Sequence, residues 1–123
     1  MSVKYSEDHA WVKVQDEDLV TIGITDFAQE QLGDLVYIEL QRVGHEFSRG
    51  DNISVIESVK SASDLIVPVS GEIVEVNDRL EHDPELVSDN PMDEGWFIKV
   101  KLSKHSELDE LMDEKSYQTF IED

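Results

Sequence analysis

One lysine stands apart in this sequence because of its neighbours. Lys60 lies in the middle of residues 57–64 (ESVKSASD), a stretch of mostly small side chains, and it is the only Lys or Arg between Arg49 and Arg79. A lysine in such a place is either a solvated surface charge or a site of covalent modification. Composition and spacing by themselves leave both interpretations open.

The other residue types that commonly carry chemistry are absent or scattered. The chain has no cysteine, which excludes disulfides, thiolate zinc sites and cysteine nucleophiles. No glycine-rich phosphate loop or nucleophile elbow occurs, and close carboxylate pairs arise by chance among 29 acidic residues. The four histidines have no metal-ligand spacing; they are His9, His45, His82 and His105. These observations predict a protein that is not an enzyme by itself and holds no metal.

The charge balance restricts the partners. Twenty-nine Asp and Glu stand against 10 Lys and Arg, so the formal net charge is −19. This charge repels phosphate backbones and anionic membrane surfaces, so neither nucleic acid nor membrane is expected as a partner. The acidity either serves a heavily solvated surface or steers the protein towards basic docking faces on other proteins.

Chain length and hydropathy predict a single globular domain over residues 1–123. This length is that of one ordinary domain with one core. The segment from Met1 to Asp8 lacks the basic and apolar regions of a targeting signal. No window approaches the roughly 20 apolar residues that span a bilayer.

The segments around Lys60 predict a β-hairpin with the lysine in its turn. Ile53–Val59 and Leu65–Val69 are apolar runs on either side of it. Tight turns usually contain Gly, Asn, Asp or Pro, which suit the required dihedral angles. Here Val59 and Lys60 occupy the middle instead, and departures from local rules often mark functional positions.

Most of the remaining chain shows strand patterns. Alternation and β-branched residues predict that Val36, Ile38 and Leu40 lie on one face of their strand, and that Lys99 and Lys101 point outward from theirs. The predicted strands are Trp11–Val14 and Leu19–Ile24, which form a hairpin, then Leu35–Leu40, a strand from Gly71 to Val76, and Trp96–Leu102.

Capping residues mark short helices. Thr25 or Asp26 can cap a helix that ends at Gly33. Asp83 as N-cap, with Pro84 in the first turn, predicts a second helix that ends before Asn90. Apolar residues at helical spacing follow the capping candidates Ser106 and Asp113, so one or two amphipathic helices close the chain.

The residues around Lys60 strongly resemble the lipoyl-attachment region of glycine cleavage H proteins. The resemblance covers residues 57–64 and continues through residues 68–77 (PVSGEIVEVN). Further matches occur in the family's order over nearly the whole chain; they include His9, Trp11, residues 23–25 (GIT), residues 32–34 (LGD), Glu39-Leu40 and Gly95-Trp96.

The resemblance implies a fold and a set of site residues. The fold is a lipoyl/biotinyl-carrier-like β-sandwich, a flattened barrel or barrel-sandwich hybrid, with short peripheral and C-terminal helices. Lys60 would be the attachment site of a covalent lipoate, as N6-lipoyl-lysine. Glu57 would serve recognition by the attaching enzyme. Gly71 is expected to have a structural role near the hairpin, by adopting a backbone conformation barred to side chains.

The implied function is that of a lipoyl carrier of the glycine cleavage system. It shuttles the aminomethyl group of glycine from glycine decarboxylase (P protein) to aminomethyltransferase (T protein). Dihydrolipoyl dehydrogenase (L protein) would reoxidise the arm, and a lipoate ligase or octanoyltransferase would attach it. The redox-active sulfurs belong to the cofactor, which explains how a chain without cysteine takes part in thiol chemistry.

Two alternatives remain open. An H-like protein that relays lipoyl groups to 2-oxo acid dehydrogenase complexes would have the same attachment motif. An acidic scaffold or binding module would carry the same lysine unmodified. The expected location is the cytoplasm if the protein is prokaryotic and the mitochondrial matrix if it is a mature organelle form.

Overall fold

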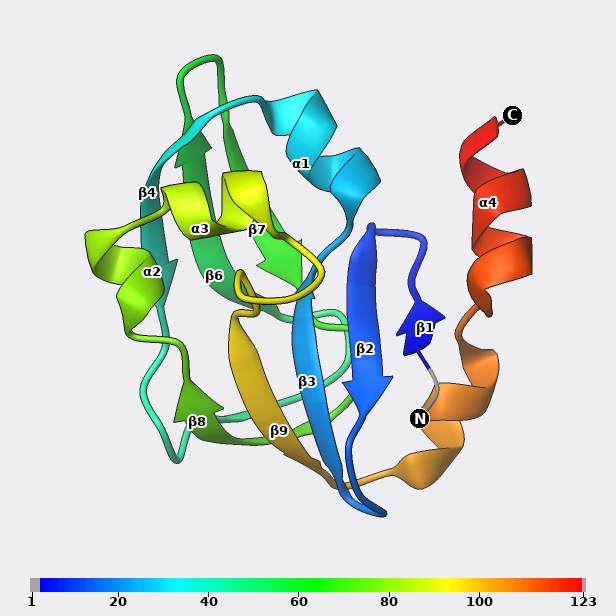
Figure 1. Cartoon of the computed structure of the whole chain (residues 1–123). Helices are drawn as coiled ribbons and strands as arrows, with labels where there is room; N and C mark the ends of the chain where they lie inside the picture. The colour runs from blue at the N-terminus through cyan, green and yellow to red at the C-terminus, as the bar shows by residue number, and fades with distance from the viewer. Residues whose placement is uncertain (1–2, 123) are drawn as a thin grey trace.

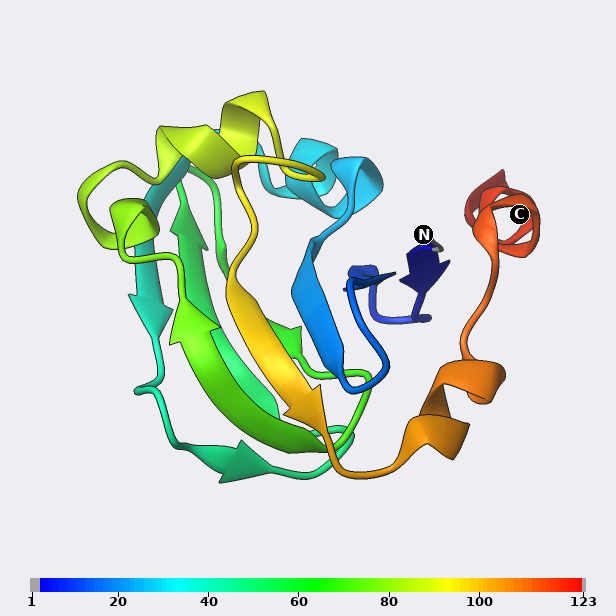
Figure 2. The ribbon, with the colours of Figure 1, turned by 60° about the horizontal axis from the view of Figure 1, so that its bottom comes forward.

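Within residues 3–122, nine strands form two antiparallel sheets, and short helices lie around them (Figures 1 and 2). The computed structural model describes residues 3–122; residues 1, 2 and 123 of the predicted domain lie outside the described residues. The strands are β1 (Val3–Tyr5), β2 (Ala10–Val14), β3 (Leu19–Ile24), β4 (Leu35–Leu40), β5 (Glu46–Phe47), β6 (Asn52–Ser58), β7 (Ala62–Ile66), β8 (Gly71–Val76) and β9 (Ile98–Leu102). The helices are α1 (Asp26–Leu32), α2 (Arg79–His82), α3 (Glu85–Asp89), the 3₁₀ helix η1 (His105–Glu110) and α4 (Glu114–Glu122).

The two sheets pack as a sandwich. The larger has the order β1-β2-β3-β9-β8-β5 and the smaller has the order β4-β6-β7. No ladder pairs the two sheets among residues 3–122, so the strands do not close into a barrel. The predicted mainly β carrier-like sandwich with peripheral helices is confirmed.

The core lies between the sheets and takes apolar side chains from both. Ile22, Ile73 and Val100 come from the larger sheet and Ile38 and Ile56 from the smaller, each no more than 1% exposed. Fully burying one such side chain stabilises the fold by about 1.5–3 kcal/mol. This core supports the inner face of the β6–β7 hairpin, whose tip projects beyond the sheet (Figure 1).

Local capping signals act largely as predicted. The Thr25 side chain accepts a hydrogen bond from the Ala28 backbone at 3.2 Å, so Thr25 and not Asp26 caps α1. The Asp113 carboxylate accepts from the Ser116 backbone at 2.8 Å at the start of α4. The second predicted cap is wrong, because the Asp83 side chain makes no capping bond and Pro84 holds the N-cap position of α3.

The predicted face of β4 is confirmed for the buried Ile38 and the half-buried Leu40, but it is wrong for Val36. Ile38 is buried, but Val36 is 55% exposed. The pairing of β4 with β6 shifts register between Leu35 and Tyr37, which is an irregularity of the β-bulge type. The extra residue breaks the alternation, so Val36 and Tyr37 both point away from the core.

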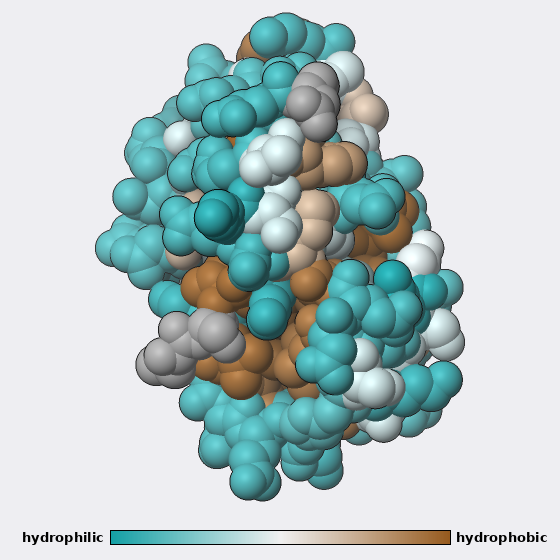
Figure 3. Space-filling view, turned by 90° about the vertical axis from the view of Figure 1, so that its right-hand side faces the viewer, coloured by the Kyte–Doolittle hydropathy of each residue, from teal (hydrophilic) through white to brown (hydrophobic). Residues whose placement is uncertain are grey.

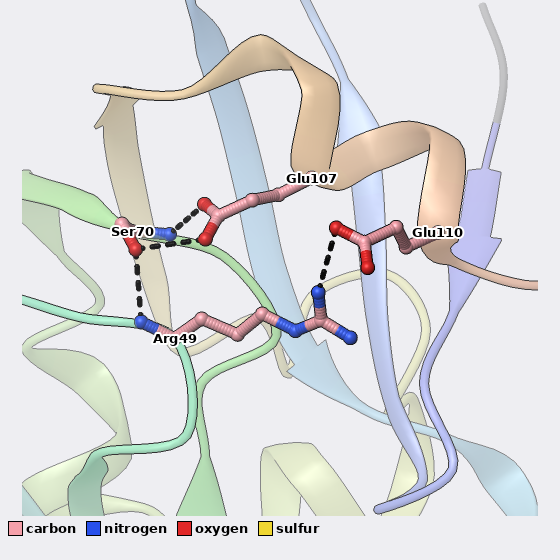
Figure 4. Close-up of polar contacts among 4 residues, drawn as sticks. All are labelled: Arg49, Ser70, Glu107 and Glu110. Carbon is pink, nitrogen blue, oxygen red and sulfur yellow. Dashed lines mark hydrogen bonds and ion pairs between the residues drawn. The ribbon is translucent and has the colours of Figure 1, made fainter.

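A buried carboxylate attaches the C-terminal segment to the sandwich (Figure 4). Glu107 of η1 is 7% exposed and accepts hydrogen bonds from the Ser70 backbone at 2.6 Å and the Ser70 hydroxyl at 2.9 Å. The Ser70 hydroxyl in turn accepts from the Arg49 backbone at 2.9 Å. These bonds satisfy the polar groups at the corner before β8.

Candidate functional site

Lys60 lies in the turn between β6 and β7 and is exposed to solvent. This turn forms the projecting tip of the β6–β7 hairpin (Figure 1). The last pair of the ladder joins Glu57 to Ala62, and the Ser58 N–H donates to the Ser61 carbonyl at 2.8 Å. The predicted strand at Ile53–Val59 is confirmed by β6. The second predicted strand, Leu65–Val69, is wrong in its position, because β7 begins at Ala62, directly after the turn, and ends at Ile66. The hairpin thus carries the lysine away from the body of the sandwich.

The Ser58 side chain explains how this turn forms without Gly or Asn. Its hydroxyl oxygen accepts from the Lys60 N–H at 3.2 Å and from the Ser61 N–H at 3.0 Å. Among the described non-glycine residues only His9 has a positive φ, so Val59 and Lys60 need no left-handed conformation. Because the Ser58 side chain satisfies the backbone donors of the turn, the tip does not need Gly, Asn, Asp or Pro and can contain Val59 and Lys60.

The connection between α1 and β4 supports the tip from one side. The Val59 N–H donates to the Asp34 carbonyl at 3.0 Å. Gly33 closes α1 with φ +83° and ψ −155°, a conformation that is open essentially to glycine alone. A β-carbon at Gly33 would lie 2.9 Å from Cε and 3.6 Å from Nζ of Lys60. The lysine stem therefore lies in a space that exists because residue 33 has no side chain.

Sequence reasoning identified Gly33 only as a helix stop and did not connect it with Lys60. Their contact joins segments that are far apart in the chain, and local patterns carry no signal of it. The same is true of the Asp34 carbonyl, whose bond to the tip is a backbone interaction.

The electrostatics around the tip are acidic. Glu57 is exposed and lies opposite Tyr37 on β4. The Tyr37 hydroxyl donates to the Glu39 carboxylate at 3.2 Å, and this bond, the charge of Glu39 and those of Glu57 and Glu81 raise the pKa of Tyr37. No ion pair within residues 3–122 involves Lys60, so the amine makes no such bond that acylation would have to break.

The predicted role of Gly71 is wrong in its mechanism. Its φ lies outside the left-handed region, and it belongs to β8 of the larger sheet, opposite Leu102, away from the hairpin tip. A β-carbon there would stand 2.3 Å from the Lys101 carbonyl oxygen. Gly71 is required because the backbone of β9 approaches closely, and not because of an unusual conformation.

A cavity of about 210 Å³ lies between β1, the segment after η1 and the end of β7. Its apolar lining includes Val67 and Leu111. Its charged lining consists of Glu7, Asp8 and the ion pair of Arg49 with Glu110. The face that carries the C-terminal helices shows apolar side chains gathered within a hydrophilic surround (Figure 3). Val67 directly follows β7, so the cavity lies at the opposite end of this strand from Lys60.

Two further searches of residues 3–122 gave negative results. No group of three or more His, Asp or Glu is placed to hold a metal ion. No described helix is long and apolar enough to span a membrane.

A two-sheet sandwich that presents an exposed lysine at a hairpin tip defines a carrier protein of the lipoyl and biotinyl type. Residues 3–123 match the sequence model of the glycine cleavage H-protein family. The chain belongs to the glycine cleavage H-protein family, the lipoyl carriers of the glycine cleavage system, which are not catalytic by themselves. The family, the fold and the carrier function predicted from the sequence are confirmed.

Individual relatives support this assignment over the full length. The chain is 52% identical to the glycine cleavage system H protein of Parvibaculum lavamentivorans, over 98% of this chain and 95% of the relative. It is 49% identical to that of Thermotoga maritima, over 95% and 94%. The crystal structure of a glycine cleavage system H protein from Mycobacterium marinum superposes with a TM-score of 0.87, at 36% identity, covering 96% of this chain and 94% of that one.

Proposed function

We propose that residues 1–123 form one carrier domain, that Lys60 carries the lipoyl group, and that this arm takes the aminomethyl group of glycine from the decarboxylase to the aminomethyltransferase. The observation that carries the proposal is the position of Lys60: exposed at a hairpin tip, outside every described ion pair, with its stem over Gly33. An acylated lysine keeps the same four-carbon stem, so the space over Gly33 fits the modified residue as well as the free one.

Attachment replaces a charged amine by a neutral amide. The deprotonated Nζ of Lys60 forms a bond to the carboxyl carbon of an activated acyl donor such as an acyl adenylate. The bond from that carbon to the leaving group breaks, the adenylate leaves with the electron pair, and the amine gives up a proton to solvent. Lysine suits this reaction because its amine can deprotonate, whereas the guanidinium of arginine stays charged.

The chain's own residues present and protect the arm. Once bound, the lipoyl group supplies a disulfide that can be reduced, loaded and reoxidised. Ser58 and the Asp34 carbonyl hold the tip in one conformation. The cavity beyond β7 is the proposed shelter for the loaded end, because the carboxylates of Glu7 and Asp8 in its lining suit a group that bears an amine. Shelter from water would lengthen the life of a labile adduct.

Two further residues have proposed roles. Glu57, on the strand that leads into the turn, is exposed where an attaching enzyme reaches Lys60, which supports a role in recognition. Gly71 is proposed as a structural residue of the sandwich, for the steric reason given above.

The proposed partners are glycine decarboxylase, aminomethyltransferase, dihydrolipoyl dehydrogenase and a lipoate ligase or octanoyltransferase. Family membership supports this set. The proposed location is the cytoplasm of a bacterial cell, since the relatives named above are bacterial proteins.

The test is the intact mass of the parent protein and of Lys60→Arg, each co-expressed with a lipoate-attaching enzyme and supplied with lipoate. We expect one lipoyl increment on the parent and none on the variant. The lipoylated parent should then accept an aminomethyl group when glycine and the decarboxylase are added. If the parent gains no mass while a known lipoyl domain in the same cells does, the proposal fails. Lipoylation without loading by the decarboxylase would favour the relay function instead.

A further inference from the structure

Three exposed apolar side chains lie in the lysine-bearing turn or on β4, the strand that pairs with β6 beside it. Val59 is 66% exposed, Val36 is 55% exposed and Tyr37 is 45% exposed. We refer to Val36, Tyr37 and Val59 as the tip patch. Large apolar side chains at exposed positions are a cost to a free protein when they lie together, and such groups commonly mark interaction sites.

Backbone hydrogen bonds and strand pairing hold the residues of the tip patch close to one another. The Val59 N–H donates to the Asp34 carbonyl at 3.0 Å, two residues before Val36. On the other side, Leu35 pairs with Ser58 and Tyr37 pairs with Glu57. The bulge between Leu35 and Tyr37 turns both Val36 and Tyr37 outward. A regular strand would have shown only one of them to solvent.

Carboxylates flank the tip patch. Tyr37 is hydrogen bonded to Glu39, and the charges of Glu57 and Glu81 also act on its hydroxyl. Within residues 3–122 none of these three carboxylates forms an ion pair. A phenol ring beside three unpaired carboxylates is suited to a guanidinium or ammonium group, which can lie over the ring and pair with the acids. The complementary surface is therefore apolar with basic groups at its edge.

We propose that the tip patch, with Glu39 and Glu81 beside it, is the docking surface for the enzyme that acylates Lys60. This inference rests on the proposed attachment at Lys60. The acylating enzyme is chosen over the other partners because the group it reacts with, the free lysine amine, lies close to the tip patch. A free lysine projects only its own side chain, so the acylating enzyme must contact the residues beside the tip. Partners that act later meet the end of a longer arm and can dock elsewhere.

The test uses Val36→Thr/Tyr37→Thr, because threonine keeps the strand propensity while it removes most of the apolar surface. The matched control is Val43→Thr/Val74→Thr. Val43 and Val74 are 60% and 40% exposed and lie outside the β4–β6–β7 sheet. Acylation by a purified lipoate ligase is followed by intact mass at several carrier concentrations. Equal urea midpoints establish that both variants are folded.

We expect kcat/KM for acylation to fall roughly tenfold in the patch variant, mainly through KM, because loss of an apolar contact at a docking centre costs about that factor in affinity. The control should stay within about twofold of the parent. Glu39→Gln/Glu81→Gln should weaken the dependence of kcat/KM on salt concentration, since it removes charge steering.

A second measurement tests the choice of partner. Each variant is driven to complete lipoylation with excess ligase, chemically reduced, and then reoxidised by dihydrolipoyl dehydrogenase with NAD. The patch variant should be reoxidised at the parent rate. Unchanged acylation in the patch variant would overturn the docking surface, and an equal loss in both reactions would overturn its assignment to the acylating enzyme. Absence of lipoylation in the parent itself would instead refute the proposed function.

Discussion

The stem of Lys60 lies against Gly33, so closely that a β-carbon at position 33 would stand 2.9 Å from the lysine ε-carbon. Gly33 therefore has two roles at once: it ends α1 with a positive φ, and it makes room for the base of the proposed arm. The end of a helix and the tip of a hairpin are thereby coupled.

Gly33→Ala should affect both stability and attachment. Forcing alanine into this backbone conformation should lower the free energy of unfolding by about 1–3 kcal/mol, measured by urea denaturation. The added methyl should also displace the Lys60 stem and reduce kcat/KM for lipoylation by a factor of about two to five.

Gly44→Ala is the control for that substitution. Gly44 also has a positive φ, +94°, but nothing lies within 4 Å of a β-carbon there. It should lose stability and keep the parent's lipoylation kinetics. Equal kinetic effects in the two variants would show that the Gly33–Lys60 contact has no part in attachment.

Ser58→Ala should loosen the turn without preventing modification. The Ser58 hydroxyl oxygen accepts from two backbone donors in the turn, so its loss should cost about 0.5–1.5 kcal/mol of folding free energy. Ser61→Ala is the control, because no hydrogen bond of the Ser61 hydroxyl occurs among the described residues. Urea denaturation of the two variants gives the comparison, and equal stabilities would contradict the role of Ser58.

Two glutamates on the same 3₁₀ helix should differ in their importance (Figure 4). Glu107→Ala leaves the Ser70 N–H buried without an acceptor, which should cost about 1–3 kcal/mol. Glu110→Ala removes an ion pair with Arg49 whose side chains are 42% and 58% exposed, and should cost less than about 1 kcal/mol. Thermal or urea unfolding measures both, and a larger loss in Glu110→Ala would refute the assignment of Glu107 as the main attachment of η1.

His9 should make stability depend on pH near neutrality. Burial lowers its pKa below the ordinary value of 6.5, so the unfolded state binds a proton at a higher pH than the folded state does. The contribution of neutral His9 to the free energy of unfolding is fully present above about pH 6.5, and it is lost as the pH falls from there through the lower pKa of the folded state. His9 also packs on Phe27 with ring centroids 4.7 Å apart, and its Nδ1 lies 2.8 Å from the Tyr117 hydroxyl.

His9→Asn tests this dependence, because asparagine tolerates the positive φ of 66° at this position and does not titrate. The loss of unfolding free energy between pH 7.5 and 5.5 should be smaller in the variant than in the parent, as measured by urea denaturation at each pH. Carboxylates titrate in both proteins and largely cancel in the comparison. An identical loss of unfolding free energy in the parent and the variant would show that His9 does not cause the pH dependence.

The sequence by itself determined the features that depend on residues close together in the chain. The apolar, β-branched run at Leu19–Ile24 specified a strand. The side chains of Thr25 and Asp113 specified helix starts, because each caps a backbone group three residues away. The apolar runs around Lys60 specified a hairpin with the lysine in its turn. The sequence also identified the family and its lipoyl function, since the resemblance extends over nearly the whole chain.

Only the tertiary structure decided the features that depend on contacts between distant segments. The three-residue strand β1 exists because it pairs with β2, and its bridge to Met112 joins the two ends of the chain. The bulge that exposes Val36 follows from the register of β4 on β6. Position 71 must be glycine because a backbone carbonyl of β9 leaves no room for a side chain there. The contact of Lys60 with Gly33 likewise needs the hairpin and α1 to be packed together. Local propensities describe a few neighbouring residues, whereas register and close approach are set by the packing of the whole sandwich.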